Sequence, residues 1–389
     1  MVSMRFHLEG SLSPDPAVRG VERLLEPDGA RRFVRDLRAN GIASRSARVR
    51  AAVVKQRPGQ RAVLRIEVEE GGPGDGSDAD ITRDEAVAVW YAKLCRSSSA
   101  WKRLYDPGLF ELADRAAQAG VQVPLPVVWL PRFRALLTKY APGTPLVGIL
   151  GTETSGDTLA QFGLALGRLH LLLPLCGEAR GPAFEREQIL HARDRYLKDN
   201  RPELLASFDE RMRDWWEQRP AELDEADRPL VCLHGDLHLR QILCRDRDEE
   251  AFPFALLDWD SVCSGDAERD VANLLAHLLL EAEAGRCPRE KCYAGIRRLL
   301  HGYEAVRSLD PARTNWYLTG TLLRLAALHA SPVFGPITPV PASLSPAILA
   351  ATRRVETFGG GNGIEGSSAR ETLEKGAPSW PIGNGSGLC

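Results

Sequence analysis

Alternating apolar and polar residues predict a small sheet in the first part of the chain. Residues 61–69 place their apolar side chains two positions apart, a period that is typical of a half-buried strand. This apolar face consists of Ala62, Leu64, Ile66 and Val68. Residues 49–55 are the expected partner strand, across a polar turn. A third strand is expected at 87–94, and two more at 127–130 and 135–140.

Helical spacing of apolar residues dominates the rest of the chain. Residues 107–119 carry apolar positions three or four apart and end before Gly120, which predicts a helix. Residues 159–173 repeat this spacing and predict a second amphipathic helix. Further helices are expected at 18–41, 187–219, 271–280 and 287–330.

Two short apolar runs predict a β-hairpin directly after the polar motif HGDLHLRQ at 234–241. The runs are 242–244 and 254–257. Antiparallel pairing brings Gln241, before the first arm, close to Asp258, at the end of the second, and Asp236 lies on the loop that leads in. Two carboxylates and an amide oxygen suit Mg²⁺, which prefers oxygen ligands and shares them with phosphates. The pattern therefore indicates a phosphoryl-transfer centre.

These residues resemble the aminoglycoside phosphotransferase and choline kinase-like family of the protein-kinase-like fold. HGDLH at 234–238 is followed by an amide residue, then by LLDWDS at 256–261 and SGDAERDVA at 264–272. The three motifs occur in the family's order, and the resemblance extends over residues 48–330. It implies an α+β fold of two lobes, with a small antiparallel-sheet N-lobe and a larger, mostly helical C-lobe.

The resemblance also implies a role for each motif residue. Asp236 would accept or orient the proton of the attacking hydroxyl, and Asp258 would hold the Mg²⁺ that bridges the phosphates of ATP. His234 would brace the catalytic loop. Asp266 and Asp270 would fix the backbone after Asp258.

Gln241 departs from the family, which usually has Asn at this position. Gln carries the same amide oxygen on a longer stem, so Gln241 can ligate the metal after a local shift, and its part in a second metal position is open. His238, inside the loop, is expected to pack or form hydrogen bonds rather than act directly. His170, on the helix at 159–173, is expected to be structural.

A lysine closes an otherwise apolar face of the third strand. Lys93 follows Val87, Val89 and Tyr91 on this face. Because a buried ammonium is costly without an anion, we expect Lys93 to bind the α- and β-phosphates of ATP; the alternative is a surface lysine whose charge stays in solvent. Glu111, on the following helix, would orient Lys93 or is a solvated helix charge.

Two further segments would complete the nucleotide site. The resemblance implies that the first hairpin caps the phosphates with Arg57 and Gly59; since the chain has no G-x-G-x-x-G, an ordinary turn is the alternative. APGTPL at 141–146 resembles the linker between the lobes. The backbone near Tyr140 and Ala141 would then hydrogen-bond the adenine.

The predicted organisation has four parts. They are an N-terminal helical extension (1–47), an N-lobe with the sheet and one helix (48–140), a C-lobe (141–357) and a flexible tail rich in Gly, Ser and Pro (358–389). The helices outside the catalytic hairpin would select the acceptor.

Composition favours a cytoplasmic enzyme over a nucleic-acid-binding or membrane protein. The 389 residues are 44% hydrophobic and 26% charged, with a net charge of −2. No apolar run reaches the ~18 residues of a membrane span, and the N-terminus lacks the apolar segment of a secretory signal. The eight cysteines lack disulfide-framework or zinc spacing. We interpret Cys232, Cys244 and Cys263 as small hydrophobic thiols in a reduced cytoplasm.

The sequence therefore predicts an ATP- and Mg²⁺-dependent phosphotransferase that acts on a hydroxyl of a sugar-like or other small molecule. Residues 281–350 contain eight basic and five acidic residues, a net charge of +3 that disfavours polycationic aminoglycosides. One alternative is an aminoglycoside-inactivating phosphotransferase. Another is a nucleotide-binding regulator without turnover, suggested by Gln241 and the absent glycine motif. The acceptor, the choice between ATP and GTP, and the oligomeric state stay open.

Overall fold

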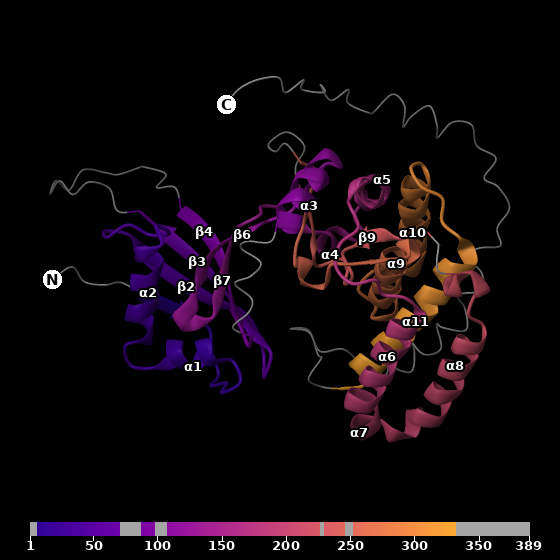
Figure 1. Ribbon diagram of the computed structural model, residues 1–389, viewed down its shortest axis with the longest axis horizontal. Helices are drawn as coiled ribbons and strands as arrows, with labels where there is room; N and C mark the ends of the chain where they lie inside the picture. The colour runs from indigo at the N-terminus through magenta and orange to yellow at the C-terminus, as the bar shows by residue number, and fades with distance from the viewer. Residues whose placement is uncertain (1–5, 71–86, 98–106, 226–228, 246–251, 332–389) are drawn as a thin grey trace, which may run out of the picture.

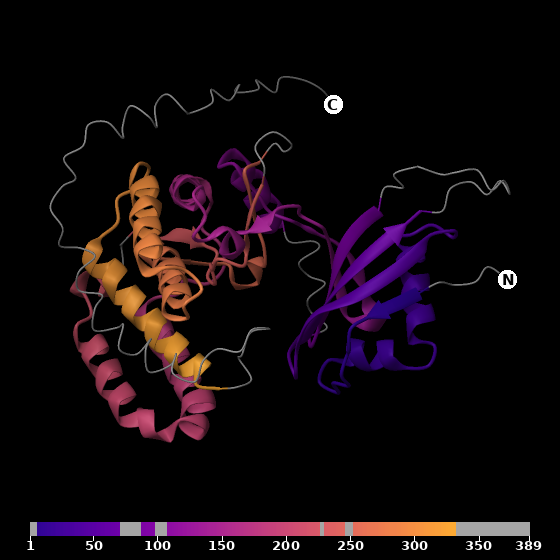
Figure 2. The same cartoon turned by 180° about the vertical axis from the view of Figure 1, so that it is seen from behind.

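The computed structural model describes residues 6–70, 87–97, 107–225, 229–245 and 252–331. These residues form a smaller lobe built on a sheet and a larger, mostly helical lobe (Figures 1 and 2). The predicted two-lobed α+β architecture is confirmed. The expected tail at 358–389 lies outside the described residues. Within the described parts, no helix is both long and apolar enough to cross a membrane.

The N-lobe contains a six-stranded sheet in the order β1-β2-β3-β4-β7-β6. The strands are β1 (Phe6–Glu9), β2 (Arg48–Arg57), β3 (Arg61–Glu69), β4 (Val87–Cys95), β6 (Pro126–Leu130) and β7 (Ala135–Lys139). All neighbours are antiparallel except β1 and β2. The apolar face predicted for β3 is fully buried, which confirms the alternation along this strand.

The N-terminal segment belongs to the core of this lobe. Helices α1 (Arg19–Leu25) and α2 (Gly29–Ala39) bury Val21 and Phe33 in the same apolar cluster as the β3 face. The segment also contributes β1, a strand that the sequence did not predict. The expected extension at 1–47 is therefore only partly helical and is integral to the N-lobe.

The C-lobe confirms the predicted hairpin. Strands β10 (Ile242–Cys244) and β11 (Phe254–Leu256) pair antiparallel. They lie inside a four-stranded sheet with β5 (Val121–Gln122) on one side and β8 (Thr144–Pro145) on the other. A separate antiparallel pair is formed by β9 (Val231–Leu233) and β12 (Cys263–Gly265). These short strands place the catalytic motifs within the helical lobe.

Helices surround this central hairpin. They are α3 (Pro107–Gln118), α4 (Leu146–Ile149), α5 (Ser155–Leu172), α6 (Pro182–Ala192), α7 (Lys198–Asn200), α8 (Leu205–Glu217), α9 (Ala267–Glu283), α10 (Arg289–Glu304) and α11 (Pro311–His329). Figures 1 and 2 show α5, α9 and α10 together on one part of the lobe, and α6, α8 and α11 together on another.

Two tryptophans fix α8 against α11. The rings of Trp215 and Trp316 stack with centroids 4.5 Å apart. The indole N–H of Trp215 donates to the carbonyl of Trp316 (2.8 Å), and that of Trp316 donates to the carbonyl of Trp215 (3.0 Å). Because both buried indoles are satisfied across the interface, the position of α11 is well defined.

Helix α3 belongs to the C-lobe, which corrects the prediction that it is the one helix of the N-lobe. Leu112 and Ala116 are buried in the C-lobe core with Phe162 of α5. In Figure 1, α3 lies beside α5 and apart from the large sheet. The amphipathic pattern of α3 was recognised, but the pattern does not specify which core buries the apolar face.

A disulfide joins Cys176, after α5, to Cys232 of β9, with a sequence separation of 56 residues. The interpretation of Cys232 as a free hydrophobic thiol is therefore wrong, because the fold brings two distant cysteines within 5.5 Å between Cα atoms. Cys244 and Cys263 are free thiols as predicted. The cytoplasmic location stays a prediction.

We expect the disulfide to stabilise the C-lobe by about 2–4 kcal/mol, because it restricts a long loop in the unfolded chain. Thermal unfolding with and without reductant measures this contribution. Reductant should lower the Tm of the wild type but not of the Cys176→Ser/Cys232→Ser variant. The control Cys95→Ser, which changes a cysteine outside this disulfide, should respond like the wild type. A wild-type Tm that ignores reductant would contradict the bond.

Candidate active site

The loop after β9 holds the H-G-D motif in a tight turn. Gly235 has a φ of +79°, and a Cβ atom at this position would lie 2.2 Å from the carbonyl oxygen of Ser261. Only glycine satisfies both the positive φ and this close approach. The glycine therefore sets the direction in which the loop carries Asp236.

Helix α9 anchors this loop. The carboxylate of Asp270 accepts the backbone N–H of His234 (2.7 Å) and of Gly235 (3.0 Å). One turn further along, Asn273 donates its side-chain amide to the carbonyl of Leu237 (2.7 Å). Asp270 thus fixes the catalytic loop, whereas the sequence analysis expected it to fix the backbone after Asp258.

Asp270 also faces His170 of α5, whose Nε2 lies 3.5 Å from a carboxylate oxygen. Burial would raise the pKa of Asp270, but the hydrogen bond and charge of His170 outweigh it and lower the pKa. The Nδ1 atom of His170 is 2.8 Å from the hydroxyl of Tyr303. This supports the structural role predicted for His170.

His234 connects the catalytic loop to the second motif. Its Nε2 atom lies 2.8 Å from the carbonyl oxygen of Leu257, and its ring packs on Trp259 with centroids 4.9 Å apart. These contacts agree with the predicted bracing role.

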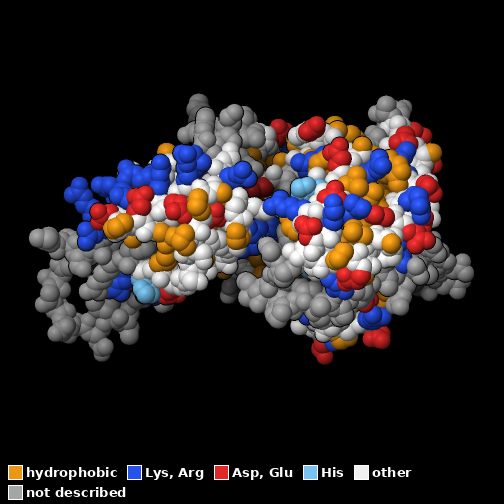
Figure 3. Space-filling view, turned by 90° about the horizontal axis from the view of Figure 1, so that it is seen from below, with side chains coloured by type: hydrophobic (Ala, Val, Ile, Leu, Met, Phe, Trp, Pro, Cys, Tyr) orange, Lys and Arg blue, Asp and Glu red, His pale blue; other side chains and the backbone are white. Residues whose placement is uncertain are grey.

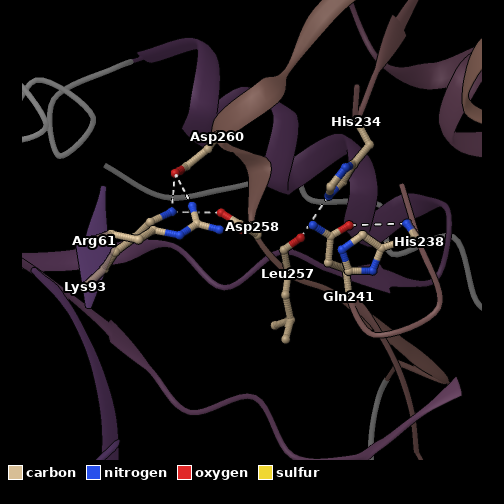
Figure 4. A network of polar contacts seen from close by, with 8 residues as sticks. All are labelled: Arg61, Lys93, His234, His238, Gln241, Leu257, Asp258 and Asp260. Atoms are coloured by element: carbon tan, nitrogen blue, oxygen red, sulfur yellow. Dashed lines mark hydrogen bonds and ion pairs between the residues drawn. The ribbon is translucent and has the colours of Figure 1, made fainter. Parts of the chain in front are cut away.

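Four charged side chains meet between the lobes, and we call them the charge quartet: Arg61, Lys93, Asp258 and Asp260 (Figure 4). Lys93 Nζ lies 2.8 Å from one oxygen of Asp258 and also contacts Asp260. Arg61 lies 3.2 Å from the other oxygen of Asp258 and 3.7 Å from Asp260. The quartet contains two carboxylates and two cations.

The two cations come from the sheet of the N-lobe, and the two carboxylates follow strand β11 of the C-lobe. Arg61 pairs with Cys95, and Lys93 pairs with Val63, so the two cations are diagonal neighbours on one face of the sheet. Asp258 has a φ of +61°, one of two positive values among the described non-glycine residues. Such a conformation costs energy and is concentrated at functional sites.

The charge quartet keeps Asp258 ionised. Burial would raise the pKa of Asp258, but the charges of Lys93 and Arg61 outweigh it and lower the pKa to about 2. Arg61 and Asp260 were not among the predicted site residues. Arg61 lies on the face of β3 opposite the predicted apolar face, and the D-x-D spacing of 258–260 was the available signal for Asp260.

The backbone of Gln241 lies beside the residue that precedes Asp258, because the N–H of Leu257 donates to the carbonyl of Gln241 (2.9 Å). Its side chain is buried, and the amide oxygen accepts the backbone N–H of His238 at 3.3 Å. In Figure 4 this oxygen points toward His238 rather than toward Asp258. The role of Gln241 as a metal ligand stays a prediction.

Glu111 does not orient Lys93, and this prediction is wrong. Glu111 is exposed and lies 3.7 Å from Arg115 on its own helix. Its helix packs its apolar side chains against the C-lobe core, and the ion pairs of Lys93 are with Asp258 and Asp260. Asp258 and Asp260 occupy the position of the anionic partner instead.

The first hairpin reaches toward the same site. Burial lowers the pKa of Arg57, and the negative charges of Asp236 and Asp258 oppose this shift. The N–H of Gly59, in contrast, donates to Asp15 of the N-terminal segment (2.8 Å). Arg57 is therefore near the predicted catalytic residues, while the amide of Gly59 already has a partner.

The linker between the lobes contacts the hairpin that carries Asp258. Ala141 is buried against Leu243 and Ala255, and the N–H of Tyr140 donates to the carbonyl of Val89 (3.1 Å). This small apolar surface lies at the position where the resemblance places adenine. Binding of adenine there stays a prediction.

A family model described as a phosphotransferase enzyme family matches residues 45–317. The chain belongs to the phosphotransferase enzyme family. This confirms the predicted family resemblance, which rested on the motifs around Asp236 and Asp258. A search of curated proteins finds no match.

Several solved structures are similar to this chain in fold. A Plasmodium vivax ethanolamine kinase is 9% identical, with a TM-score of 0.52 over 88% of this chain and 95% of that one. A thermostable mutant of aminoglycoside phosphotransferase APH(4)-Ia is 14% identical, with a TM-score of 0.50 over 79% and 95% of the two chains. The aminoglycoside phosphotransferase APH(3'')-Id from Streptomyces rimosus is 20% identical, with a TM-score of 0.48 over 77% and 97%.

The position of Glu111 leads to a direct test of the charge quartet in this phosphotransferase. If the charge quartet binds Mg²⁺ and a nucleotide, Asp260→Asn, which removes one of the two carboxylates on Lys93, should weaken that binding at least several-fold. Glu111→Gln, on the exposed face of α3, should leave it unchanged. Calorimetric titration with an ATP analogue measures both. A strong loss in Glu111→Gln with none in Asp260→Asn would restore the original assignment.

Proposed function

We propose that this protein transfers the γ-phosphate of ATP, with Mg²⁺, to a hydroxyl group of a small molecule. The observation that carries the proposal is the charge quartet. Asp258, in a costly backbone conformation, meets Lys93 of the other lobe at 2.8 Å. A carboxylate and a lysine held together beside an H-G-D loop are the elements that phosphoryl transfer needs, since this reaction depends on positioning and charge stabilisation.

The donor set fits Mg²⁺. Asp258 and Asp260 both reach Lys93, so their carboxylates lie close together. Mg²⁺ usually binds one or two carboxylates and completes its shell with water and phosphate oxygens, so two acidic residues suffice. When bound, the ion would neutralise charge on the phosphates. Gln241 would contribute its amide oxygen after releasing the N–H of His238.

The cations of the charge quartet would bind the phosphates. Lys93 and Arg61 project from one face of the sheet toward the carboxylates, so a phosphate chain beside the metal would meet both. Arg57 would add a third positive charge from the hairpin. Burial lowers the pKa of nearby Lys55 to about 8, with Arg57 and Arg61 adding to the shift. Side-chain cations would thus replace the backbone amides of a glycine-rich loop.

Asp236 would orient the acceptor hydroxyl and take its proton. The loop that carries it is fixed at three points, by Asp270, Asn273 and His234. This rigidity supports a positioning role, because in-line attack requires the hydroxyl to be held close to the γ-phosphate. The adenine would lie on the apolar surface at Ala141.

A nucleotide-binding regulator without turnover is the second candidate. Its supporting observation is the side chain of Gln241, whose oxygen is engaged inside the loop. The two candidates differ in what they demand of Asp236, because only the enzyme needs that carboxylate in a transition state.

The first test is Asp236→Asn. General-base and positioning groups contribute ~10²–10⁴-fold to rate, so the variant should lose most of kcat while its affinity for ATP changes little. Transfer of labelled phosphate across a panel of hydroxyl compounds measures kcat, and calorimetry measures ATP binding. The exposed control Asp157→Asn should match the wild type. A wild type that binds Mg-ATP but never turns it over would favour the regulator.

The second test concerns the metal ligands. If Asp258 and Asp260 hold Mg²⁺ and Gln241 only stabilises the loop, Asp260→Asn should raise the Mg²⁺ concentration needed for half-maximal activity. Gln241→Ala should lower kcat without changing that concentration. If Gln241 is a ligand, Gln241→Ala should raise the Mg²⁺ requirement and Gln241→Asn should largely preserve it.

A further inference from the structure

A group of cationic and histidine side chains lies beside the catalytic loop, outside the charge quartet. The rings of His238, in the loop, and His277, on α9, are 5.1 Å apart. Burial lowers the pKa of His277 well below its usual value, and the charges of Arg324 and His329 on α11 and of Arg240 in the loop lower it further. We call these five residues the cationic cluster.

Arg324 is tied to the catalytic loop. Its guanidinium donates to the side-chain oxygen of Asn273 (2.9 Å), and Asn273 donates to the carbonyl of Leu237 (2.7 Å). Leu237 is the residue directly after Asp236. Arg324 is therefore connected through Asn273 to the backbone next to Asp236.

Arg324 has no carboxylate partner among the described residues, and its Nε atom is buried without a hydrogen bond. Two other arginines of the C-lobe differ in this respect. Arg269 is paired with Glu185, and Arg286 is paired with Glu281. Arg324 is only partly buried, so its guanidinium can be reached from solvent, and without a carboxylate partner among the described residues it can bind an external anion.

The positive charge of the cationic cluster comes from its arginines and not from His238 or His277. Burial lowers the pKa of His238 to about 4, although the charge of Asp236 opposes this shift. His238 and His277 are therefore neutral near pH 7, and each can donate one N–H without adding charge. Arg324 and Arg240 supply the net positive charge. Figure 3 shows Lys and Arg side chains on both sides of the groove between the lobes.

We propose that the cationic cluster binds an anionic group of the acceptor, a carboxylate or a phosphate, with Arg324 as its main ligand. The inference rests on the proposed function, because it assigns this site to the acceptor. A guanidinium can donate parallel N–H groups to two oxygens of a carboxylate or of a phosphate. The acceptor would then be a hydroxy acid, a sugar acid or a sugar phosphate. A polycationic aminoglycoside or an amino alcohol would be repelled.

Matched acceptors test the charge preference. Each series has an anionic, a neutral and a cationic member: gluconate, glucose and glucosamine, or glycerate, glycerol and ethanolamine. We expect kcat/KM for phosphate transfer to be at least about tenfold higher for the anionic member. Glucose 6-phosphate compared with gluconate distinguishes a phosphate from a carboxylate. Preference for the neutral or cationic member in both series would overturn the proposal.

Variants locate the preference. Arg324→Gln should reduce kcat/KM for the anionic acceptor about ten- to hundred-fold, the size expected of a charged hydrogen-bonding pair. It should leave ATP affinity unchanged and lower kcat/KM for the neutral acceptor much less, so that the ratio of kcat/KM between anionic and neutral acceptors falls. Arg297→Gln, an exposed arginine of α10, is the matched control and should keep the anion preference. An unchanged preference in Arg324→Gln would overturn the assignment.

A binding measurement separates this proposal from the proposed function. Gluconate and glucose 6-phosphate are titrated calorimetrically into the protein with Mg²⁺ and a non-hydrolysable ATP analogue. One outcome is that the wild type binds the anion but transfers no phosphate, and that Arg324→Gln does not bind the anion. This outcome would support the cationic cluster and reject the enzyme. Transfer to a neutral acceptor with no anion binding would do the reverse. Arg240 is exposed, so Arg240→Gln should not disturb the core. It should weaken anion binding less than Arg324→Gln does, and it tests the cationic cluster even if Arg324→Gln does not fold.

Discussion

The buried carboxylate of Asp270 is the constraint on which the site depends. It is 1% exposed, and an uncompensated charge in such a place would cost several kcal/mol. The backbone N–H groups of His234 and Gly235 and the ring of His170 compensate it. Since these groups come from the catalytic loop and from α5, satisfying Asp270 places the loop against two helices at once.

Helix α9 extends this constraint along the whole loop. Asp270, Asn273 and His277 are three and four residues apart, so they share one face of the helix. They contact His234, Leu237 and His238 in the same order. One rigid element thus sets the orientation of Asp236 and also the environment of Arg324, which Asn273 binds on its other side. Sites built on regular elements are held more precisely than sites built on loops alone.

The sequence predicted what local patterns encode. Alternation located the buried face of β3, and the apolar runs located β10 and β11, whose pairing brings the backbone of Gln241 beside Leu257, the residue before Asp258. The errors concern long-range packing. No local signal shows that α3 packs on the C-lobe and turns Glu111 to solvent, or that Cys176 meets Cys232. Arg61 was missed because alternation separates two faces of a strand but does not show that the polar face is covered by another lobe.

The charge quartet explains how a site can be ordered before its ligands arrive. Its two carboxylates and two cations balance, so each lobe satisfies the charges of the other. All four side chains stay 20–30% exposed, and ion pairs accessible to solvent contribute only about 0–1 kcal/mol each. Under the proposed function, Mg²⁺ would take the carboxylates and the phosphates would take Lys93 and Arg61. Binding would thus exchange the weak ion pairs between the four side chains for contacts of the same side chains with Mg²⁺ and the phosphates. Little energy would be needed to break these ion pairs.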